Sequence, residues 1–279
     1  MANYGDGYIA IGPDLGQHGE FQETHDSFFD PIKQALAQAN IQCRFGRWDI
    51  PGNPRVILVT GFKERFNIER LLHAYWDEFG VDSYEGGWDY VEPILFSTSC
   101  AEIIELIAKG TFKENDQGVA HFHEWMSGAG VLYLRQNMPS IGTVLTTHAT
   151  MLGRAMAHHD PYYYNTIETA GNLKEYAHRH GVQSKHSMES ISAKNSDCFT
   201  TVSEITAREA YKVLGVNPDL VVYNGMNVKE SLKVDAKAKQ EKKDYLLKIC
   251  GSFLGETLPP ETQIWISSGR YEFKNKGYD

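Results

Sequence analysis

Short apolar runs alternate with helical periodicity along residues 8–222, and this alternation constrains the fold more than any other feature of the sequence. The runs that predict strands are 8–11, 44–48, 55–60, 118–122, 141–147, 198–202 and 220–222. The stretches that predict helices are 26–39, 67–79, 92–109, 125–136, 184–195 and 204–214. Strands separated by helices indicate βαβ units and a parallel sheet covered on both faces. We therefore expect an α/β protein.

The composition changes after Asn227, which suggests a domain boundary. Residues 229–248 are rich in Lys and Glu and have little apolar content before Tyr245, as expected of a linker helix. A further strand is predicted at 263–267, and a basic, glycine-bracketed turn follows it. A strand with such a turn is typical of the opening of an α/β domain. We therefore divide the chain into residues 1–228, an α/β domain, and residues 229–279, a linker helix with the start of a second domain.

Charge, apolar runs and cysteines exclude several classes of partner. The formal net charge of −9 argues against a nucleic-acid partner, because neutralising phosphates requires a basic face. No apolar run approaches the roughly 20 residues of a membrane span, so no membrane partner is expected. The four cysteines are widely spaced and no signal peptide is visible, which favours reduced thiols and a cytoplasmic location.

The most informative stretch is the apolar β-branched run 143–147, which ends in His148 and is followed by Arg154. Ligands of open α/β sheets bind outside the carboxyl ends of the strands. A histidine there can hydrogen-bond sugar hydroxyls, and an arginine at a helix start can hold a phosphate with two parallel hydrogen bonds. The alternative is a capping histidine and a surface arginine.

A second group, His121, His123 and Glu124, stands at another predicted strand end. Two histidines one residue apart lie on one side of a strand, so a metal site with His148 or an acid as a third ligand is one interpretation. The other is a buried, hydrogen-bonded histidine, with Glu124 favoured by the N-terminus of the next helix. Because no further His, Asp or Glu pattern completes a coordination set, we expect no metal.

Two weaker motifs follow later in the chain. Asn224-Gly225 comes after a predicted strand and is typical of a turn. Arg270 and Lys276 place two cations on the glycine-bracketed turn, which suits a diphosphate but also suits a solvated basic loop.

Together the motifs resemble the glycogen synthase family of the animal, fungal and Bacteroides-like type, glycosyltransferase family three. The matching segments, in the family's order, are Ala-His-Phe-His-Glu-Trp (120–125), Thr-Thr-His-Ala-Thr-Met-Leu-Gly-Arg (146–154), Phe-Thr-Thr-Val-Ser-Glu-Ile-Thr-Ala-Arg-Glu-Ala (199–210), Asn-Gly-Met-Asn-Val (224–228) and Gly-Arg-Tyr-Glu-Phe-Lys-Asn-Lys-Gly (269–277). The resemblance implies a GT-B fold of two Rossmann-like domains. It implies retaining transfer of glucose from UDP-glucose to the non-reducing end of an α-1,4-glucan such as glycogen, without a metal or other cofactor.

The resemblance also implies roles for individual residues. His148 corresponds to the active-site histidine near the transferred sugar, and Arg154 to a donor contact. Arg270 and Lys276 would hold the diphosphate of UDP, because a transferase without a metal must supply cations where negative charge develops. The remaining candidates for substrate binding are His123, Glu124 and Asn224.

The sequence departs from the family pattern in ways that limit these expectations. It lacks the family's opening strand with its Lys-Val-Gly-Gly loop, the Glu-bearing motif of the second domain, and the stretch that vertebrate and yeast relatives use for glucose-6-phosphate. We therefore expect a fragment that is inactive alone. The choice between UDP- and ADP-glucose, the regulation and a homo-oligomeric state stay open. Two other functions also stay open: a non-catalytic glucan-binding or assembly module, and a metal-dependent hydrolase built on the three histidines.

Overall fold

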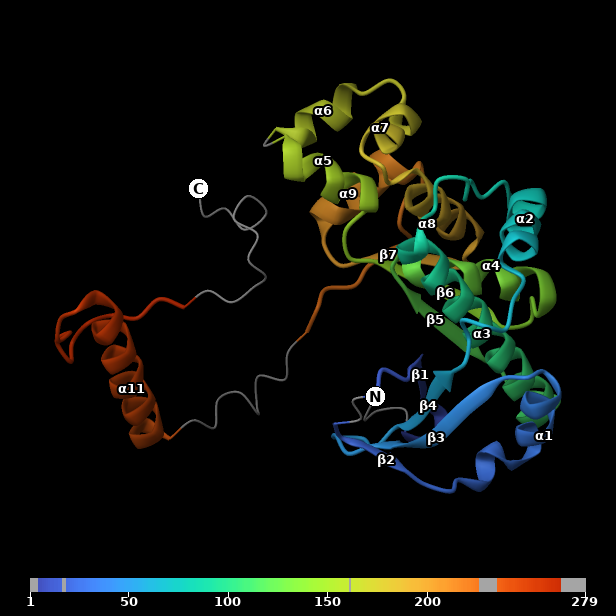
Figure 1. The fold of residues 1–279 in the computed structure, drawn as a ribbon, viewed down its shortest axis with the longest axis horizontal. Coiled ribbons are helices and arrows are strands. Elements are labelled where there is room, and N and C mark those ends of the chain that lie inside the picture. The colour runs from blue at the N-terminus through green and yellow to red at the C-terminus, as the bar shows by residue number, and fades with distance from the viewer. Residues whose placement is uncertain (1–4, 17–18, 161, 226–234, 267–279) are drawn as a thin grey trace. The chain divides into compact units, whose positions relative to one another are not determined.

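The computed structural model describes residues 5–16, 19–160, 162–225 and 235–266. The chain divides into two compact units, Met1–Tyr223 and Asn224–Asp279, and each is described by itself. Figure 1 shows the first unit as layered sheets and helices. The candidate site residues His121, His123, Glu124, His148 and Arg154 all belong to this first unit.

The first sheet of this unit is mixed. Its strands, in the order β1-β4-β3-β2, are β1 (Ile9–Pro13), β4 (Arg55–Thr60), β3 (Gln42–Trp48) and β2 (Phe21–Glu23). β1 runs parallel to β4, whereas β3 is antiparallel to both of its neighbours. The expectation of a parallel sheet therefore holds for β1 and β4 but not for β3, because a short turn joins β3 to β4 and a parallel pair needs a longer crossover.

The second sheet is the expected parallel sheet. Its strands, in spatial order, are β5 (Val119–His123), β6 (Gly142–Thr147), β7 (Cys198–Thr201) and β8 (Leu220–Val221). Every neighbouring pair is parallel, with His123 opposite Thr146. The carboxyl ends of β5 and β6 therefore lie side by side, and the predicted α/β fold class is confirmed.

The helices of the first unit connect the strands and cover the sheets (Figure 1). They are α1 (Asp30–Gln38), α2 (Ile68–Phe79), α3 (Trp88–Thr111), α4 (Gly128–Asn137), α5 (Met151–His159), α6 (Tyr163–Thr169), α7 (Leu173–Arg179), α8 (Gln183–Asn195) and α9 (Glu204–Leu214). The sequence places Arg154 at a helix start but gives no bounds for α5, and it does not predict α6 and α7. Helices of seven to nine residues are too short to be stable alone, so packing decides whether they form.

Helix α3 lies at the centre of the first unit. Its Tyr90, Ile94 and Ile103 belong to the core that covers the mixed sheet. Its Ala101 and Ala108 belong to the core around the parallel sheet. A helix that is buried nearly all round is expected to carry apolar residues on every face, as α3 does.

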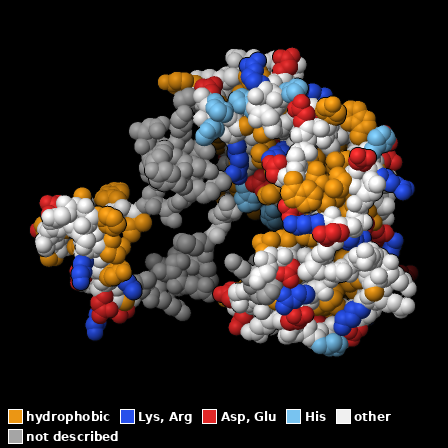
Figure 2. All heavy atoms as spheres, in the orientation of Figure 1, with side chains coloured by type: hydrophobic (Ala, Val, Ile, Leu, Met, Phe, Trp, Pro, Cys, Tyr) orange, Lys and Arg blue, Asp and Glu red, His pale blue; other side chains and the backbone are white. Residues whose placement is uncertain are grey.

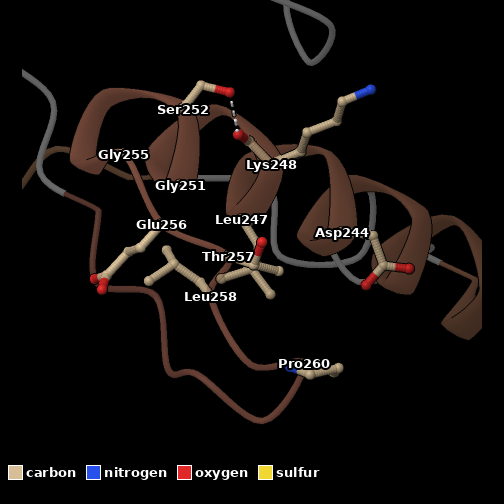
Figure 3. Close-up of a pocket in the computed structure, with 10 residues that line it drawn as sticks. All are labelled: Asp244, Leu247, Lys248, Gly251, Ser252, Gly255, Glu256, Thr257, Leu258 and Pro260. Atoms are coloured by element: carbon tan, nitrogen blue, oxygen red, sulfur yellow. Dashed lines mark hydrogen bonds between the residues drawn. The ribbon is translucent and has the colours of Figure 1, made fainter.

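The second unit contains one long described helix, α11 (Ala236–Leu254). Asp235 caps its first turn, and Gly255 ends it with a left-handed φ of 73°. A cavity of about 660 Å³ lies between α11 and the following segment as far as Pro260, and no residue predicted as part of the site lines it. Figure 3 shows the residues that line it.

The strand predicted at 263–267 is not a strand where the structure describes it. Residues 263–266 have no regular secondary structure, and Trp265 is 91% exposed. A strand is stable only when a neighbour completes its hydrogen bonds, and the described residues of this unit offer none.

Two further expectations concern chemistry outside the site. None of the described helices is long and apolar enough to cross a lipid bilayer. Cys43, Cys100, Cys198 and Cys250 are all free thiols, so no disulfide joins them.

Candidate functional site

The carboxyl ends of β5 and β6 bring three histidines together. The ring centroids of His121 and His123 are 4.2 Å apart, and those of His123 and His148 are 5.7 Å apart. His148 Nε2 lies 3.5 Å from His123 Nδ1. Two of these rings come from β5 and one follows β6, so the parallel register of the two strands creates the cluster.

Hydrogen bonds at the floor of the site hold the first of these rings. His121 Nε2 lies 2.7 Å from Thr146 Oγ1, which lies 2.6 Å from Thr200 Oγ1 of β7. The pKa of His123 is lowered to about 4, first by desolvation of the His123 ring and then by repulsion from His121 and His148. His123 is therefore a neutral imidazole at neutral pH, able to donate one hydrogen bond and accept another.

Glu124 has an unusual backbone conformation, with φ 64° and ψ 169°. This region of φ and ψ belongs almost entirely to glycine, and another residue there stores about 1–3 kcal/mol of strain. Glu124 N donates to Thr146 O at 2.9 Å, which fixes the bend where β5 ends. Strained residues cluster at functional sites, so the backbone alone indicates that this position serves more than the fold.

The side chain of Glu124 reaches across to the end of β6. Its Oε1 accepts a hydrogen bond from His148 N at 3.2 Å and lies 3.8 Å from a guanidinium nitrogen of Arg154. Desolvation raises the pKa of Glu124, against the opposing influence of Arg154 and of the His148 amide. The Arg154 side chain remains 43% exposed, so its guanidinium can still meet a ligand.

Two carboxylates that the sequence analysis missed lie directly behind this surface. Glu209 of α9 accepts hydrogen bonds from Thr150 N at 3.1 Å and Thr150 Oγ1 at 2.7 Å. Glu189 of α8 accepts one from Met151 N at 2.9 Å. Both acids lie on the buried faces of their helices. An acidic residue at an apolar helical position is the signal that could have found them.

The structure brings four of the predicted residues to one place: His123, Glu124, His148 and Arg154. Asn224 is exposed and belongs to the second unit, so it is not placed relative to them. The remaining two, Arg270 and Lys276, lie outside the described residues.

The metal interpretation of the histidine cluster gains no support from the geometry. In the part of the chain that the structure describes, no three His, Cys, Asp or Glu side chains are arranged to hold a metal ion. The Thr146 hydroxyl already occupies His121 Nε2.

The first unit presents a mixed surface of imidazole and charge. Figure 2 shows histidine side chains at several separate places on the visible face, some of them next to basic and acidic side chains. Neutral imidazoles, a carboxylate and an exposed guanidinium are groups that can bind a ligand carrying both hydroxyls and negative charge.

Comparison with known proteins identifies the family. The model of the family described as "Glycogen synthase" matches residues 1–279. The chain is 32% identical over 288 residues to "Glycogen [starch] synthase, liver" of Mus musculus, covering 99% of this chain and 40% of that relative. It is 30% identical over 301 residues to "Glycogen [starch] synthase isoform 2" of Saccharomyces cerevisiae, covering 100% of this chain and 42% of that relative.

A third relative, "Glycogen [starch] synthase" of Neurospora crassa, is 30% identical over 291 residues, covering the whole of this chain and 40% of that protein. The chain thus spans about two fifths of the length of the curated relatives it matches. The match over its whole length confirms the resemblance drawn from the five motifs: this chain belongs to the glycogen synthase family.

Proposed function

We propose that the protein to which this chain belongs transfers glucose from UDP-glucose to the non-reducing end of an α-1,4-glucan, with retention at the anomeric carbon. Family membership supports the class of reaction. The observation that carries the proposal to this site is the meeting of His148, Glu124 and Arg154 at the carboxyl ends of β5 and β6.

The site's residues have distinct proposed roles. Breaking the glucosyl–diphosphate bond leaves negative charge on the leaving phosphate, and cations placed in advance lower the barrier. Arg154 is proposed to stabilise this negative charge, because its guanidinium is partly exposed at the site. Arg270 and Lys276 are proposed to hold the diphosphate with it, and Asn224 to contact the substrate.

The histidines are proposed to bind the sugar. His148 is partly exposed, and its ring is within reach of His123 Nδ1. A donor sugar bound here would find ring nitrogens for its hydroxyls on one side and the Glu124 carboxyl on the other. We propose no metal or other cofactor for this arrangement.

The direct test is glucan-dependent release of UDP by the full-length protein. UDP-glucose and glycogen together should give UDP, and His148→Ala should lower kcat at least about 100-fold, as expected for the loss of a positioned catalytic group. His73→Ala is the matched control, because His73 is exposed on α2 and forms an ion pair with Asp77 in the following turn. A parent protein that releases no UDP with glycogen present would refute the proposal.

Three further measurements separate the alternatives. Activity that persists in EDTA is expected, whereas loss of activity on metal removal and recovery on metal addition would favour the hydrolase. Co-sedimentation with glycogen without any nucleotide binding would favour a glucan-binding module. Competition between UDP- and ADP-glucose would decide the donor.

A further inference from the structure

The turn that carries His148 is held by three carboxyl groups from three different elements. The His148 amide donates to Glu124 at 3.2 Å. The Thr150 amide donates to Glu209 at 3.1 Å, and the Met151 amide donates to Glu189 at 2.9 Å. Two of these acids come from helices packed behind the turn, α9 and α8. The position of the His148 ring therefore depends on side chains that do not face the ligand surface.

Glu189 differs from the other two in its surroundings. Its side chain is completely buried, and its Oε1 has no hydrogen-bond partner among the described residues. Glu124 has Arg154 within 3.8 Å, and Glu209 accepts four hydrogen bonds, including one from Tyr163 Oη at 2.5 Å. A buried carboxylate with one amide donor and no paired cation is costly, so the neutral acid is favoured at this position.

The surroundings of Glu189 as a whole favour the same protonation state. Desolvation raises the pKa of Glu189 to about 8; the Met151 amide and Arg154 oppose this rise, and the negative charges of Glu124 and Glu209 add to it. These groups come from the strand end after β5, from α9 and from α5. If Glu189 is neutral, no third negative charge is added to those of Glu124 and Glu209, which have Arg154 nearby.

We propose that Glu189 is a positioning residue, which acts as an uncharged carboxylic acid and fixes His148 by accepting the first amide of α5. The part of this proposal that concerns turnover rests on the function proposed above. The part that concerns the turn does not, because it predicts a local structure that can be measured without substrate.

Isosteric substitution separates a neutral acceptor from a charged one. Glu189→Gln keeps a carbonyl oxygen for the Met151 amide and cannot ionise, so it should behave like the parent at pH 7. Glu189→Leu keeps the volume but removes the acceptor. Glu69→Gln, at an exposed position in the first turn of α2, is the control for loss of a carboxylate elsewhere.

Hydrogen exchange provides the readout that does not need activity. In Glu189→Leu the Met151 amide should exchange at least about tenfold faster than in the parent protein, whereas Glu189→Gln should leave its rate within about twofold. On raising the pH from 7 to 9, exchange in the parent should speed up beyond its intrinsic base catalysis, and Glu189→Gln should lack this extra increase. Equal exchange in parent and Glu189→Leu would overturn the proposal, and so would an exchange rate in Glu189→Gln as fast as in Glu189→Leu.

Kinetics then test whether the turn matters for transfer. Glu189→Leu should lower kcat about 10–100-fold with KM within about twofold, because a displaced histidine affects the reacting geometry more than ground-state binding. Glu189→Gln should retain kcat and keep it at pH 9, where the parent declines. A carboxylate requirement, shown by inactive Glu189→Gln at pH 7, would overturn the proposal. A parent protein without transferase activity but with the expected exchange pattern would refute only the proposed function.

Discussion

Replacing Gly153 by alanine is expected to damage the site through a single methyl group. Gly153 lies in the first turn of α5, directly above the buried Glu209. A Cβ built there would lie 2.3 Å from Glu209 Oε1 and 2.6 Å from Thr150 Oγ1, much closer than atoms can approach. Glu209 cannot swing away freely, because it is 5% exposed and accepts hydrogen bonds from Thr150 and Tyr163.

The magnitude follows from opposing terms. Overpacking a filled site costs about 2 kcal/mol, and losing one hydrogen bond to a charged acceptor costs about 2 kcal/mol more. Alanine recovers about 1 kcal/mol over glycine through its helix propensity. We therefore expect Gly153→Ala to lower the free energy of unfolding by about 3 kcal/mol, which corresponds to a fall in Tm of about 9 °C for a unit of this size.

Thermal and urea unfolding followed by circular dichroism would measure this loss. Gly142→Ala is the matched control: its added Cβ would meet only ordinary contacts, the nearest being 3.7 Å away on Val119. This variant should stay within about 0.5 kcal/mol of the parent. If Gly153→Ala unfolds at the parent temperature, the close packing of α5 on Glu209 is not as described and the reasoning fails.

Three other substitutions or reagents test separate features of the first and second units. A hydrogen bond from Arg55 lowers the pKa of Asp26 to about 2 from an ordinary 3.8, so Asp26→Asn should lower the free energy of unfolding in urea by about 2 kcal/mol at pH 7. This loss should shrink as the pH falls from about 4 to 2, and a loss that does not depend on pH would contradict the prediction. Glu124→Gly should have a free energy of unfolding about 1–3 kcal/mol higher than Glu124→Ala, and so a higher denaturant midpoint, because only glycine adopts φ 64° and ψ 169° without strain. Equal midpoints would show that the strain is absent. A thiol reagent should label Cys250 quickly in the native protein and leave Cys100 unlabelled, because Cys100 is buried and burial raises its pKa; rapid modification of Cys100 would contradict its placement in the core.

Strand patterns in the sequence predict much of the site. The apolar run ending at His148 predicts β6, and the His-x-His segment predicts β5. Because the two strands are parallel neighbours, Glu124 and Arg154 follow them to the same edge. Local periodicity is sufficient where a functional residue directly follows a strand.

Strand patterns do not find the residues behind the site, whose signal is an acidic residue at an apolar position of a helix. Glu189 and Glu209 lie on helices that are distant in sequence from His148, and their burial depends on how those helices pack. The backbone strain at Glu124 has no sequence signature either, since a glycine would be the expected residue there. The prediction of a strand at 263–267 is wrong for residues 263–266, because periodicity does not show whether a neighbouring strand is available.

Helix α3 determines how the first unit should unfold. Its 24 residues contribute Ile94 and Ile103 to one core and Ala101 and Ala108 to the other, so neither sheet can lose its packing while α3 stays in place. Residues 5–223 should therefore melt in one cooperative transition rather than sheet by sheet. The mixed sheet carries none of the four described residues that meet at the site, yet a destabilising substitution within it should reduce the population of proteins with an intact His148 turn.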